Sequence, residues 1–365
     1  MFLKKLTLIS FRNYTQDEFQ FHPRLNILTG ANRAGKTTIL EAIYCLVLGR
    51  SSRTTMLREA VQWGKGAFSL QGVIENNQAE DESIKIILSS PPEKNEVKKE
   101  IFWQDKPLTN ITELWRQIGL VYFSSEELYL IKGEPEIRRR MLNVLLSQLK
   151  PNYYFSYLRY QRSLRERNAC LKRIVQNQSG VSELLAWDEG LIKTGEYLTT
   201  QRMMLVDKLS QEAGLNYPQI SGGAEKLTII YQPSIKSDFR QELTASRPQE
   251  MCLGTTLVGP HRDEVGFLLD GKSLKHFGSQ GECRSAVLAV KLAEVEVFKQ
   301  AKGWQPLVLF DDVFSELDKQ RQDFFLRCLD HGFQCFITTT HLPSGWMDLN
   351  DPAKKIFQLE PQNVL

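Results

Sequence analysis

Residues 30–38 carry the sequence Gly30-Ala31-Asn32-Arg33-Ala34-Gly35-Lys36-Thr37-Thr38. This stretch fits G-x-x-x-x-G-K-[ST], the phosphate-binding P-loop pattern. A short apolar run at 25–29 precedes it and predicts a strand, and an apolar run at 38–48 follows it and predicts a helix. A strand, a glycine-containing loop and a helix in this order form a cradle for nucleotide phosphates, so all nine residues are candidates for nucleotide contact.

Each part of this loop has a chemical task. Glycine lets the backbone turn tightly and aim its N–H groups at phosphate oxygens, and the start of the helix adds partial positive charge. We expect Lys36 to reach the β- and γ-phosphates and the Thr37 hydroxyl to bind Mg²⁺.

A carboxylate that completes such a site follows the apolar strand predicted at 307–310. Asp311 emerges at the end of this strand, as in a Walker B motif, where it would hold the Mg²⁺ shell. Asp312 is placed to orient or deprotonate the attacking water. Lys36, Asp311 and Asp312 are therefore the predicted catalytic residues.

A second phosphate-binding helix start is predicted at 279–282, directly before a long helix at 281–300. Ser279 can cap this helix, and Gly281 lets the backbone approach an anion. The P-loop already binds the phosphates from one side, so this second element makes sense if it faces a nucleotide on another copy of the protein. We therefore expect an ABC-type homodimer with two ATP molecules bound between its protomers.

The rest of the chain predicts an α/β protein with an inserted helical part. Strands at 67–74, 84–88 and 100–103, separated by polar and proline-containing turns, indicate an antiparallel meander, while 136–149, 153–174 and 181–215 have helical periodicity. Region 216–284 returns to strands. We predict an ABC-type ATPase head, with a mixed P-loop sheet and an antiparallel layer, at 1–128 and 255–365, and a mainly helical arm domain at 129–254.

Basic residues are concentrated in the predicted arm. Residues 130–180 hold eleven basic and three acidic side chains in a chain of net charge +3. Either these residues form a solvated helix face, or they form a surface for the DNA backbone. The DNA candidates are Arg138, Arg139, Arg140, Arg159, Arg162 and Arg165.

Composition excludes several other classes of protein. No apolar run approaches the ~18–20 residues of a membrane span, and the N-terminus lacks the features of a signal peptide. The six cysteines are scattered without a C-x-x-C pair, which indicates free thiols and a cytoplasmic protein. One turn, Phe11-Arg12-Asn13-Tyr14, is either an ordinary turn or a contact to adenine or ribose through Arg12.

Taken together, these segments resemble the RecF family of bacterial recombination and repair ATPases, which is related to the heads of structural-maintenance-of-chromosomes proteins. The resemblance covers essentially the whole chain. It is carried by the P-loop, the turn at 11–14, Asp311-Asp312 and Ser315-Glu316-Leu317-Asp318. Further support comes from Arg138-Arg139-Arg140, Tyr160, Arg165-Glu166-Arg167-Asn168, Gly259-Pro260-His261-Arg262-Asp263 and Ser279-Gln280-Gly281.

This resemblance implies ATP-dependent dimerisation on DNA, double-stranded or at a junction with single strands, and weak DNA-dependent ATPase activity. It also implies recombinational repair and replication restart at single-strand gaps, with RecO and RecR as partners and a place in the SOS response. Four positions depart from the pattern or lack an assigned role: Asn143, Ser124, Glu282 and His341. Asn143 stands where RecF-like sequences usually carry Asp, and Ser124 stands where transporter ATPases have their Q-loop Gln. Glu282 stands where the signature usually ends in Gln. His341 is either a switch histidine or a surface residue.

Two other functions compete with this one. The chain could be the ATPase subunit of a transporter-type assembly, although the basic, tyrosine-rich arm favours DNA. Alternatively, it could bind nucleotide without hydrolysing it. Only a short arm fits within residues 128–250, which excludes a long coiled-coil protein.

Overall fold

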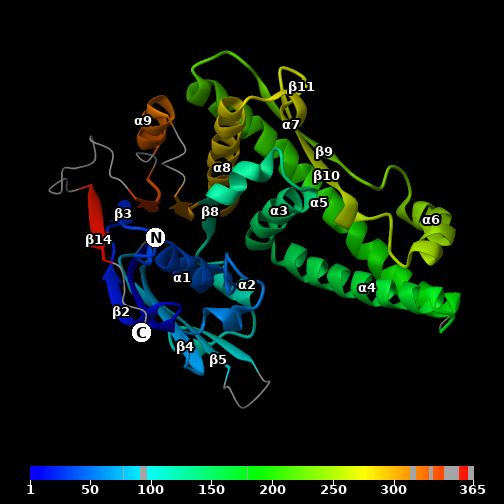
Figure 1. Cartoon of the computed structure of the whole chain (residues 1–365), viewed down its shortest axis with the longest axis horizontal. Helices are drawn as coiled ribbons and strands as arrows, with labels where there is room; N and C mark the ends of the chain where they lie inside the picture. The colour runs from blue at the N-terminus through cyan, green and yellow to red at the C-terminus, as the bar shows by residue number, and fades with distance from the viewer. Residues whose placement is uncertain are drawn as a thin grey trace. The chain divides into compact units, whose positions relative to one another are not determined.

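The computed structural model describes residues 1–76, 78–90, 97–178, 180–312, 318–328, 332–340 and 353–360 (Figure 1). The chain divides into two compact units, Met1–Glu126 with Phe298–Leu365, and Glu127–Val297. Residues 255–297, which the sequence pattern assigns to the ATPase head, belong to the second unit in this division. The functional boundaries of the domains stay a prediction.

The first unit contains a parallel sheet and an antiparallel sheet. The parallel sheet has the order β14 (Lys354–Leu359), β3 (Leu25–Gly30), β13 (Cys335–Thr339), β12 (Leu307–Asp311) and β8 (Leu120–Ser124). The antiparallel sheet has the order β2 (Tyr14–Gln20), β1 (Phe2–Phe11), β4 (Ala67–Glu75), β5 (Asp81–Ser89), β6 (Lys98–Trp103) and β7 (Lys106–Pro107). The predicted meander is confirmed, because β4 pairs antiparallel with β5, and β5 with β6.

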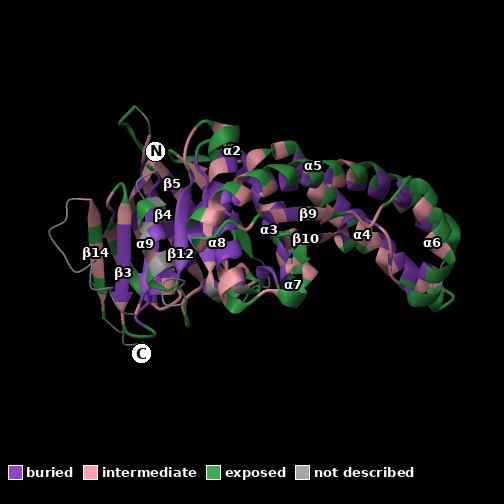
Figure 2. Cartoon of the chain, turned by 90° about the horizontal axis from the view of Figure 1, so that it is seen from above, coloured by how far each residue is buried: buried purple, intermediate pink, exposed green. Residues whose placement is uncertain are grey.

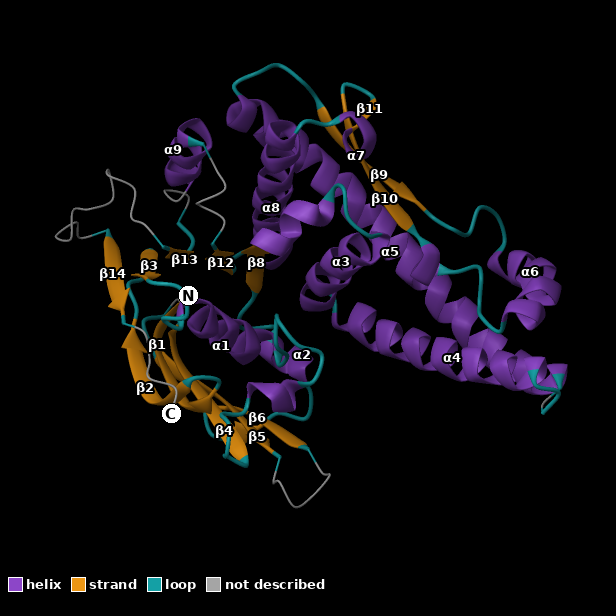
Figure 3. Cartoon of the chain, viewed as in Figure 1, coloured by secondary structure: helices purple, strands orange, loops and turns teal. Residues whose placement is uncertain are grey.

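Helix α1 (Lys36–Leu48) lies between these two sheets (Figure 3). Nine of its thirteen residues are apolar, and every residue except Thr37 is buried. The helix therefore has no solvent-facing stripe, which is why its sequence shows a continuous apolar run rather than alternating faces. This packing holds the P-loop, at the N-terminus of α1, against the carboxyl ends of the parallel strands. Three short helices complete the unit: η1 (Leu57–Ala60), α2 (Ile111–Leu114) and α9 (Lys319–Cys328).

The second unit is mainly helical (Figure 2). After η2 (Ser125–Leu130), it contains α3 (Pro135–Leu149), α4 (Pro151–Val175), α5 (Val181–Ser221), α6 (Phe239–Leu253), η3 (Pro260–Arg262), α7 (Leu274–Phe277) and most of α8 (Gln280–Lys302). A small antiparallel sheet joins β11 (Lys272–Ser273), β10 (Glu264–Leu269) and β9 (Leu227–Gln232). In Figure 2, exposed residues cover the outer faces of α4 and α5, which pack along each other.

Two helical segments differ from the sequence prediction. The sequence predicts strands over region 216–284, yet α6 lies within it, and α5 continues past Leu215 to Ser221. Helix α6 is mostly polar, contains Pro248, and buries only Phe239, Leu243 and Glu250. The sequence of α6 therefore shows only a weak helical periodicity of apolar residues. The Asp238 side chain caps it by accepting a hydrogen bond of 2.8 Å from the backbone N–H of Gln241.

Candidate functional site

The P-loop has the backbone conformation that its glycines predict. Gly35 has φ +89°, and a Cβ atom there would lie 2.5 Å from the hydroxyl oxygen of Tyr14. A Cβ atom at Gly30, where φ is +153°, would lie 2.3 Å from the carbonyl oxygen of Leu359. Both positions therefore need glycine for conformation and for space. Strand β14, which supplies Leu359, and Tyr14 on β2 thus shape the loop from outside the motif.

Lys36 lies over the loop, with only 8% of its surface exposed. Its Nζ donates hydrogen bonds to the carbonyl oxygens of Gly30, at 2.7 Å, and Ala31, at 3.0 Å. Burial lowers the pKa of Lys36, and the nearby carboxylates of Asp312 and Asp311 oppose that shift. The structure therefore brings together the lysine and both acids that the sequence predicts.

Asp311 ends β12 and is held by three hydroxyl groups. The hydroxyls of Thr37 and Thr338 donate to its Oδ1 at 2.9 and 2.8 Å, and the Tyr122 hydroxyl donates to its Oδ2 at 3.0 Å. Hydroxyl and carboxylate oxygens are hard donors that suit Mg²⁺. The predicted pair Thr37 and Asp311 thus fits a site for this ion.

Sequence reasoning missed Tyr122 and Thr338. They lie on β8 and β13, the two strands that pair with β12. Nothing in their local sequence marks them, but parallel strands around a P-loop present their carboxyl ends at one edge. Only the strand topology could have identified these two residues, because it brings polar residues of neighbouring strands to Asp311.

Asp312, the residue after Asp311, has a left-handed backbone conformation, with φ +55°. Its N–H donates to the Thr338 hydroxyl oxygen at 2.8 Å, and the residue is exposed. A non-glycine residue in this conformation is strained, and such strain collects at functional sites. The conformation supports the catalytic role proposed for Asp312.

Arg12, the candidate for a base or ribose contact, is also left-handed, with φ +54°. Its Nε and one terminal nitrogen donate to the buried Glu41 carboxylate at 3.0 and 2.6 Å, and the other nitrogen donates to the Glu59 carbonyl at 2.8 Å. The bonds to Glu41, which lies on α1, fix Arg12 beside this helix. Its contact with nucleotide stays a prediction.

Ser279 and Glu282 form a capping box at the start of α8. The backbone N–H and the hydroxyl of Ser279 donate to Glu282 Oε2 at 2.7 and 2.8 Å, and the Glu282 N–H donates to the Ser279 hydroxyl oxygen at 3.2 Å. These hydrogen bonds lower the pKa of Glu282. The departure to Glu at position 282 therefore has a structural role, and Ser279 lies exposed at the helix start.

Three buried arginines of the second unit, Arg138, Arg167 and Arg202, form what we call the arginine network, together with the acids Asp188, Glu250, Asp263 and Glu264. Arg138, only 1% exposed, binds the Glu264 carboxylate at 2.7 and 2.8 Å and donates to the carbonyls of Leu130 and Gly133. Its burial removes Arg138 from the candidates for DNA contact. Arg139 is half-buried and donates to the Asp263 carbonyl at 2.8 Å.

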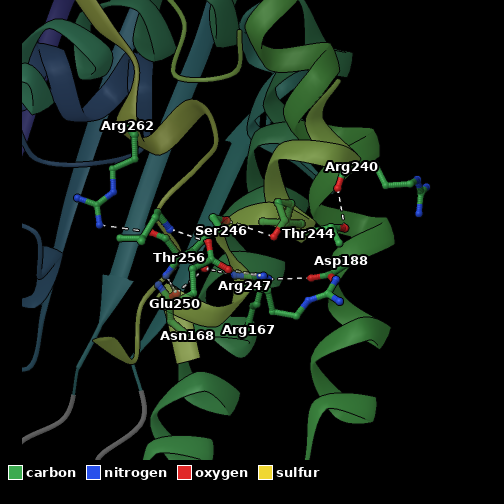
Figure 4. Close-up of polar contacts among 12 residues, drawn as sticks. Arg167, Asn168, Asp188, Arg240, Thr244, Ser246, Arg247, Glu250, Thr256 and Arg262 are labelled. Atoms are coloured by element: carbon green, nitrogen blue, oxygen red, sulfur yellow. Dashed lines mark hydrogen bonds and ion pairs between the residues drawn. The ribbon is translucent and has the colours of Figure 1, made fainter. Parts of the chain in front are cut away.

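Arg167 ties three parts of this unit together (Figure 4). It donates to Asp188 on α5 at 2.8 Å, to Glu250 on α6 at 2.7 Å and to the Thr256 hydroxyl at 2.8 Å. The neighbouring Asn168 accepts hydrogen bonds from the backbone N–H and the hydroxyl of Thr256. The Arg165–Asn168 motif therefore fixes α4 against α5 and α6.

Arg202 and the segment 259–263 form the other half of the network. Arg202 donates to Asp263 at 3.1 Å and to the Asn143 side-chain oxygen at 2.9 Å, and this oxygen also accepts from the Tyr153 hydroxyl at 2.6 Å. His261 is half-buried, with its ring nitrogens 2.6 Å from the Tyr160 hydroxyl oxygen and 3.1 Å from the Thr256 carbonyl oxygen. Burial lowers the pKa of His261 to about 4.

The exposed DNA candidates are Arg140, Arg159, Arg162 and Arg165. Ser315, Glu316, Leu317 and His341 lie outside the described residues. Within the described part of the chain, no group of three or more His, Cys, Asp or Glu side chains is arranged to hold a metal ion. None of the helices described there combines the length and apolar character that a membrane crossing requires.

Comparison with known proteins gives one consistent result. The family model "RecF/RecN/SMC N terminal domain" matches residues 2–361. A Halothermothrix orenii protein named "DNA replication and repair protein RecF" is 35% identical, with 98% of this chain and 97% of that protein aligned. A protein of the same name from Lactococcus lactis subsp. lactis is 36% identical over 94% of this chain and 93% of its own length.

Solved structures agree with these sequence matches. One described as "Structure of the recombination mediator protein RecF-ATPrS in RecFOR pathway" superposes with a TM-score of 0.88 at 30% identity, covering 99% of this chain and 96% of that one. An Smc head domain from Pyrococcus furiosus has a TM-score of 0.55 at 13% identity, covering 98% and 93%. The second similarity confirms the fold, an ABC-type ATPase head.

Proposed function

The chain belongs to the RecF family, and on this premise we propose that it is an ATP-dependent DNA-binding protein that dimerises on ATP. It acts in recombinational repair and replication restart at single-strand gaps, in the cytoplasm, as a weak DNA-dependent ATPase. Its partners are DNA and, by family, RecR and RecO. The names of its relatives place them in DNA replication and repair and in the RecFOR pathway.

The observation that carries this proposal is the arrangement around Asp311. The Thr37 hydroxyl oxygen, from the P-loop, lies 2.9 Å from Asp311 Oδ1. Lys36 lies on the same loop, near the carboxylates of Asp311 and Asp312. Residues 30–38 hold the phosphates of ATP, Lys36 neutralises their charge, and Thr37 with Asp311 holds Mg²⁺. When bound, the ion screens phosphate charge and orients the γ-phosphate. Asp312 accepts the proton of the attacking water.

The second half of the site comes from another protomer. The exposed start of α8 offers the Ser279 hydroxyl and the backbone N–H of Gly281 to the γ-phosphate of the partner's ATP. To accept this phosphate, Ser279 exchanges its bonds with Glu282 for bonds to nucleotide oxygens. Closure of the dimer then depends on ATP, and its opening depends on hydrolysis.

DNA binds the exposed arginines of the arm. Arg159, Arg162 and Arg165 follow one another at three-residue spacing on α4, and Arg140 is exposed on α3. No ion pair is found for these four among the residues that the structure describes. Their charge is therefore available for phosphates, in contrast to that of Arg138 and Arg167.

Sedimentation with ATP, without and with DNA, tests the composite site. We expect Ser279→Arg to bind ATP as a monomer and to lose the ATP-dependent dimer, because the larger cation blocks the partner's phosphate. Ser273→Arg, at the start of the short helix α7, is the matched control and should still dimerise. Dimers that persist in Ser279→Arg would show that the site is not shared.

Turnover measurements complete this experiment. Asp312→Asn should bind ATP, stay dimeric and lose hydrolysis, and Lys36→Ala should lose ATP binding itself. A wild-type protein without measurable hydrolysis would instead support a nucleotide-binding module that is not an enzyme.

A further inference from the structure

Trp63 is the most exposed large apolar residue of the described chain, with 96% of its surface accessible. By contrast, Trp115 in the same unit is 5% exposed. Tryptophan is costly to leave in water and is enriched where proteins meet a partner. An indole held almost fully in solvent therefore indicates a contact that forms only in a complex.

The turn that carries Trp63 is held firmly against β1. The backbone N–H of Lys65 donates to the Gln62 carbonyl at 3.0 Å, and the N–H of Gln62 donates to the Ser10 carbonyl at 2.9 Å. Val61 forms a bridge with Phe11, and the Gln62 side chain donates to the Thr15 hydroxyl at 3.0 Å. The indole is therefore presented on an ordered support, which reduces the entropy cost of binding.

The surroundings of Trp63 are basic. Segment 50–65 contains Arg50, Arg53, Arg58 and Lys65 but one acid, Glu59, and all five are exposed. Glu59 accepts from the Thr54 hydroxyl, and Arg53 lies 3.6 Å from the buried Glu41. Among the described residues, the Arg58 guanidinium contacts only the Met56 sulfur, at 3.6 Å, and Lys65 has no ion pair. Arg58 and Lys65, two exposed cations in the same segment as Trp63, therefore have no carboxylate partner among the described residues.

We propose that Trp63, Arg58 and Lys65 form a binding site for single-stranded nucleic acid on the first unit. The indole stacks on the face of an unpaired base, and the two cations contact the flanking phosphates. An aromatic platform beside free cations is the arrangement that binds single strands without reading their sequence. A protein partner fits less well, because Met56 is the one other large apolar residue exposed in this segment, and the cations would have to be desolvated.

An unpaired base is required because bases in a duplex are stacked on one another and their faces are covered. The site therefore distinguishes single-stranded from double-stranded DNA, which the arginines of the arm do not. It deepens the proposed function, on which it rests, by giving the first unit a contact with the single-stranded part of a gap.

The test uses the full-length protein, a fluorescent single-stranded oligothymidylate and a duplex of the same length. We expect Trp63→Ala to weaken binding of the single strand about tenfold, as removal of one stacked base predicts, and to leave duplex binding unchanged. Trp63→Phe should recover most of the affinity, because phenylalanine also stacks. Exchanging Arg58 and Lys65 together for Glu should reduce the salt dependence by about 0.7 log units per log salt for each phosphate that no longer meets a cation.

Lys106→Glu is the matched charge control. Lys106 is exposed on β7, at the opposite end of the antiparallel sheet from the β1–β2 pair, and its exchange should leave the salt dependence unchanged. Unaltered binding of the single strand by Trp63→Ala would overturn the inference. So would weaker ATP binding or loss of the DNA-free ATP dimer in that variant, since Trp63 would then belong to the nucleotide site or the protomer interface. Failure of the wild type to bind any DNA would overturn the proposed function itself.

Discussion

The nucleotide site of the first unit and the arginine network of the second unit use charge in opposite ways. In the nucleotide site, Lys36 bonds to backbone carbonyls and Asp312 is exposed in a strained conformation, so both can engage a ligand. In the network, Arg167 and Glu250 are fully buried and pair with each other. The difference shows that some arginines of an arginine-rich motif can brace the fold while their exposed neighbours stay available for a ligand.

Replacing Arg167 should change stability more than any other substitution proposed for the arginine network. Arg167→Met leaves the buried carboxylates of Asp188 and Glu250 without their main partner, so the free energy of unfolding should fall by about 3–5 kcal/mol. Urea unfolding of the arm, followed by circular dichroism, measures this loss. Arg165→Met, an exposed neighbour on α4, should have little effect on unfolding and should weaken DNA binding. Equal stability of the two variants would contradict the bracing role.

His261 tests whether the network also depends on pH. Its pKa falls from about 6.5 in the unfolded chain to about 4 in the folded protein. Folding therefore favours the neutral imidazole, and its contribution is complete above pH 6.5. As the pH falls from 6.5 towards 4, up to about 3 kcal/mol of stability is lost.

Unfolding measured across this pH range should show the decrease in the wild type. His261→Gln, which cannot be protonated, should have a flatter profile between pH 4 and 6.5, since the imidazole at position 261 then contributes nothing. Parallel profiles of the two proteins would show that folding does not favour the neutral form of His261.

Thr338→Val probes the hydrogen bonds of the nucleotide site. The variant keeps the shape of the side chain but removes the hydroxyl that donates to Asp311 and accepts from the Asp312 N–H. We expect about 1–2 kcal/mol lower stability. We also expect slower ATP turnover at nearly unchanged ATP affinity, because Asp312 loses its anchor while the P-loop is intact. Unchanged turnover would argue against a role for Asp312 in hydrolysis.

Asn143→Asp gives the smallest expected effect. The side-chain oxygen of Asn143 accepts from Arg202 and Tyr153, and a carboxylate there would add an opposite charge beside Arg202. We expect the free energy of unfolding to rise by about 1 kcal/mol, below the ~1.5–3 kcal/mol usual for a hydrogen bond to a charged group, because Arg202 already pairs with Asp263. A drop in stability, again measured in urea, would show that the network already holds enough negative charge.

The local motifs were predictable from sequence because each is a continuous stretch with its own backbone requirement. The P-loop, the Walker B strand, the meander and the helical arm all follow from glycine positions, apolar runs and periodicity over neighbouring residues. The structure confirms this fold, and it adds what the sequence did not predict, the pairing of β12 with β8 and β13. Helix α6 was missed because it is mostly polar, contains Pro248 and buries only two apolar side chains, Phe239 and Leu243.

Only the tertiary structure decided what each polar residue does. Arg138, Arg140 and Arg165 look alike in sequence, yet one is buried and two are exposed, because burial depends on which elements pack against a helix face. Tyr122 and Thr338 reach Asp311 from separate strands, an arrangement that no local pattern encodes. The sequence by itself therefore determined the backbone chemistry of residues 30–38. Which other side chains complete the site depends on the fold, because long-range packing sets their distances and their exposure.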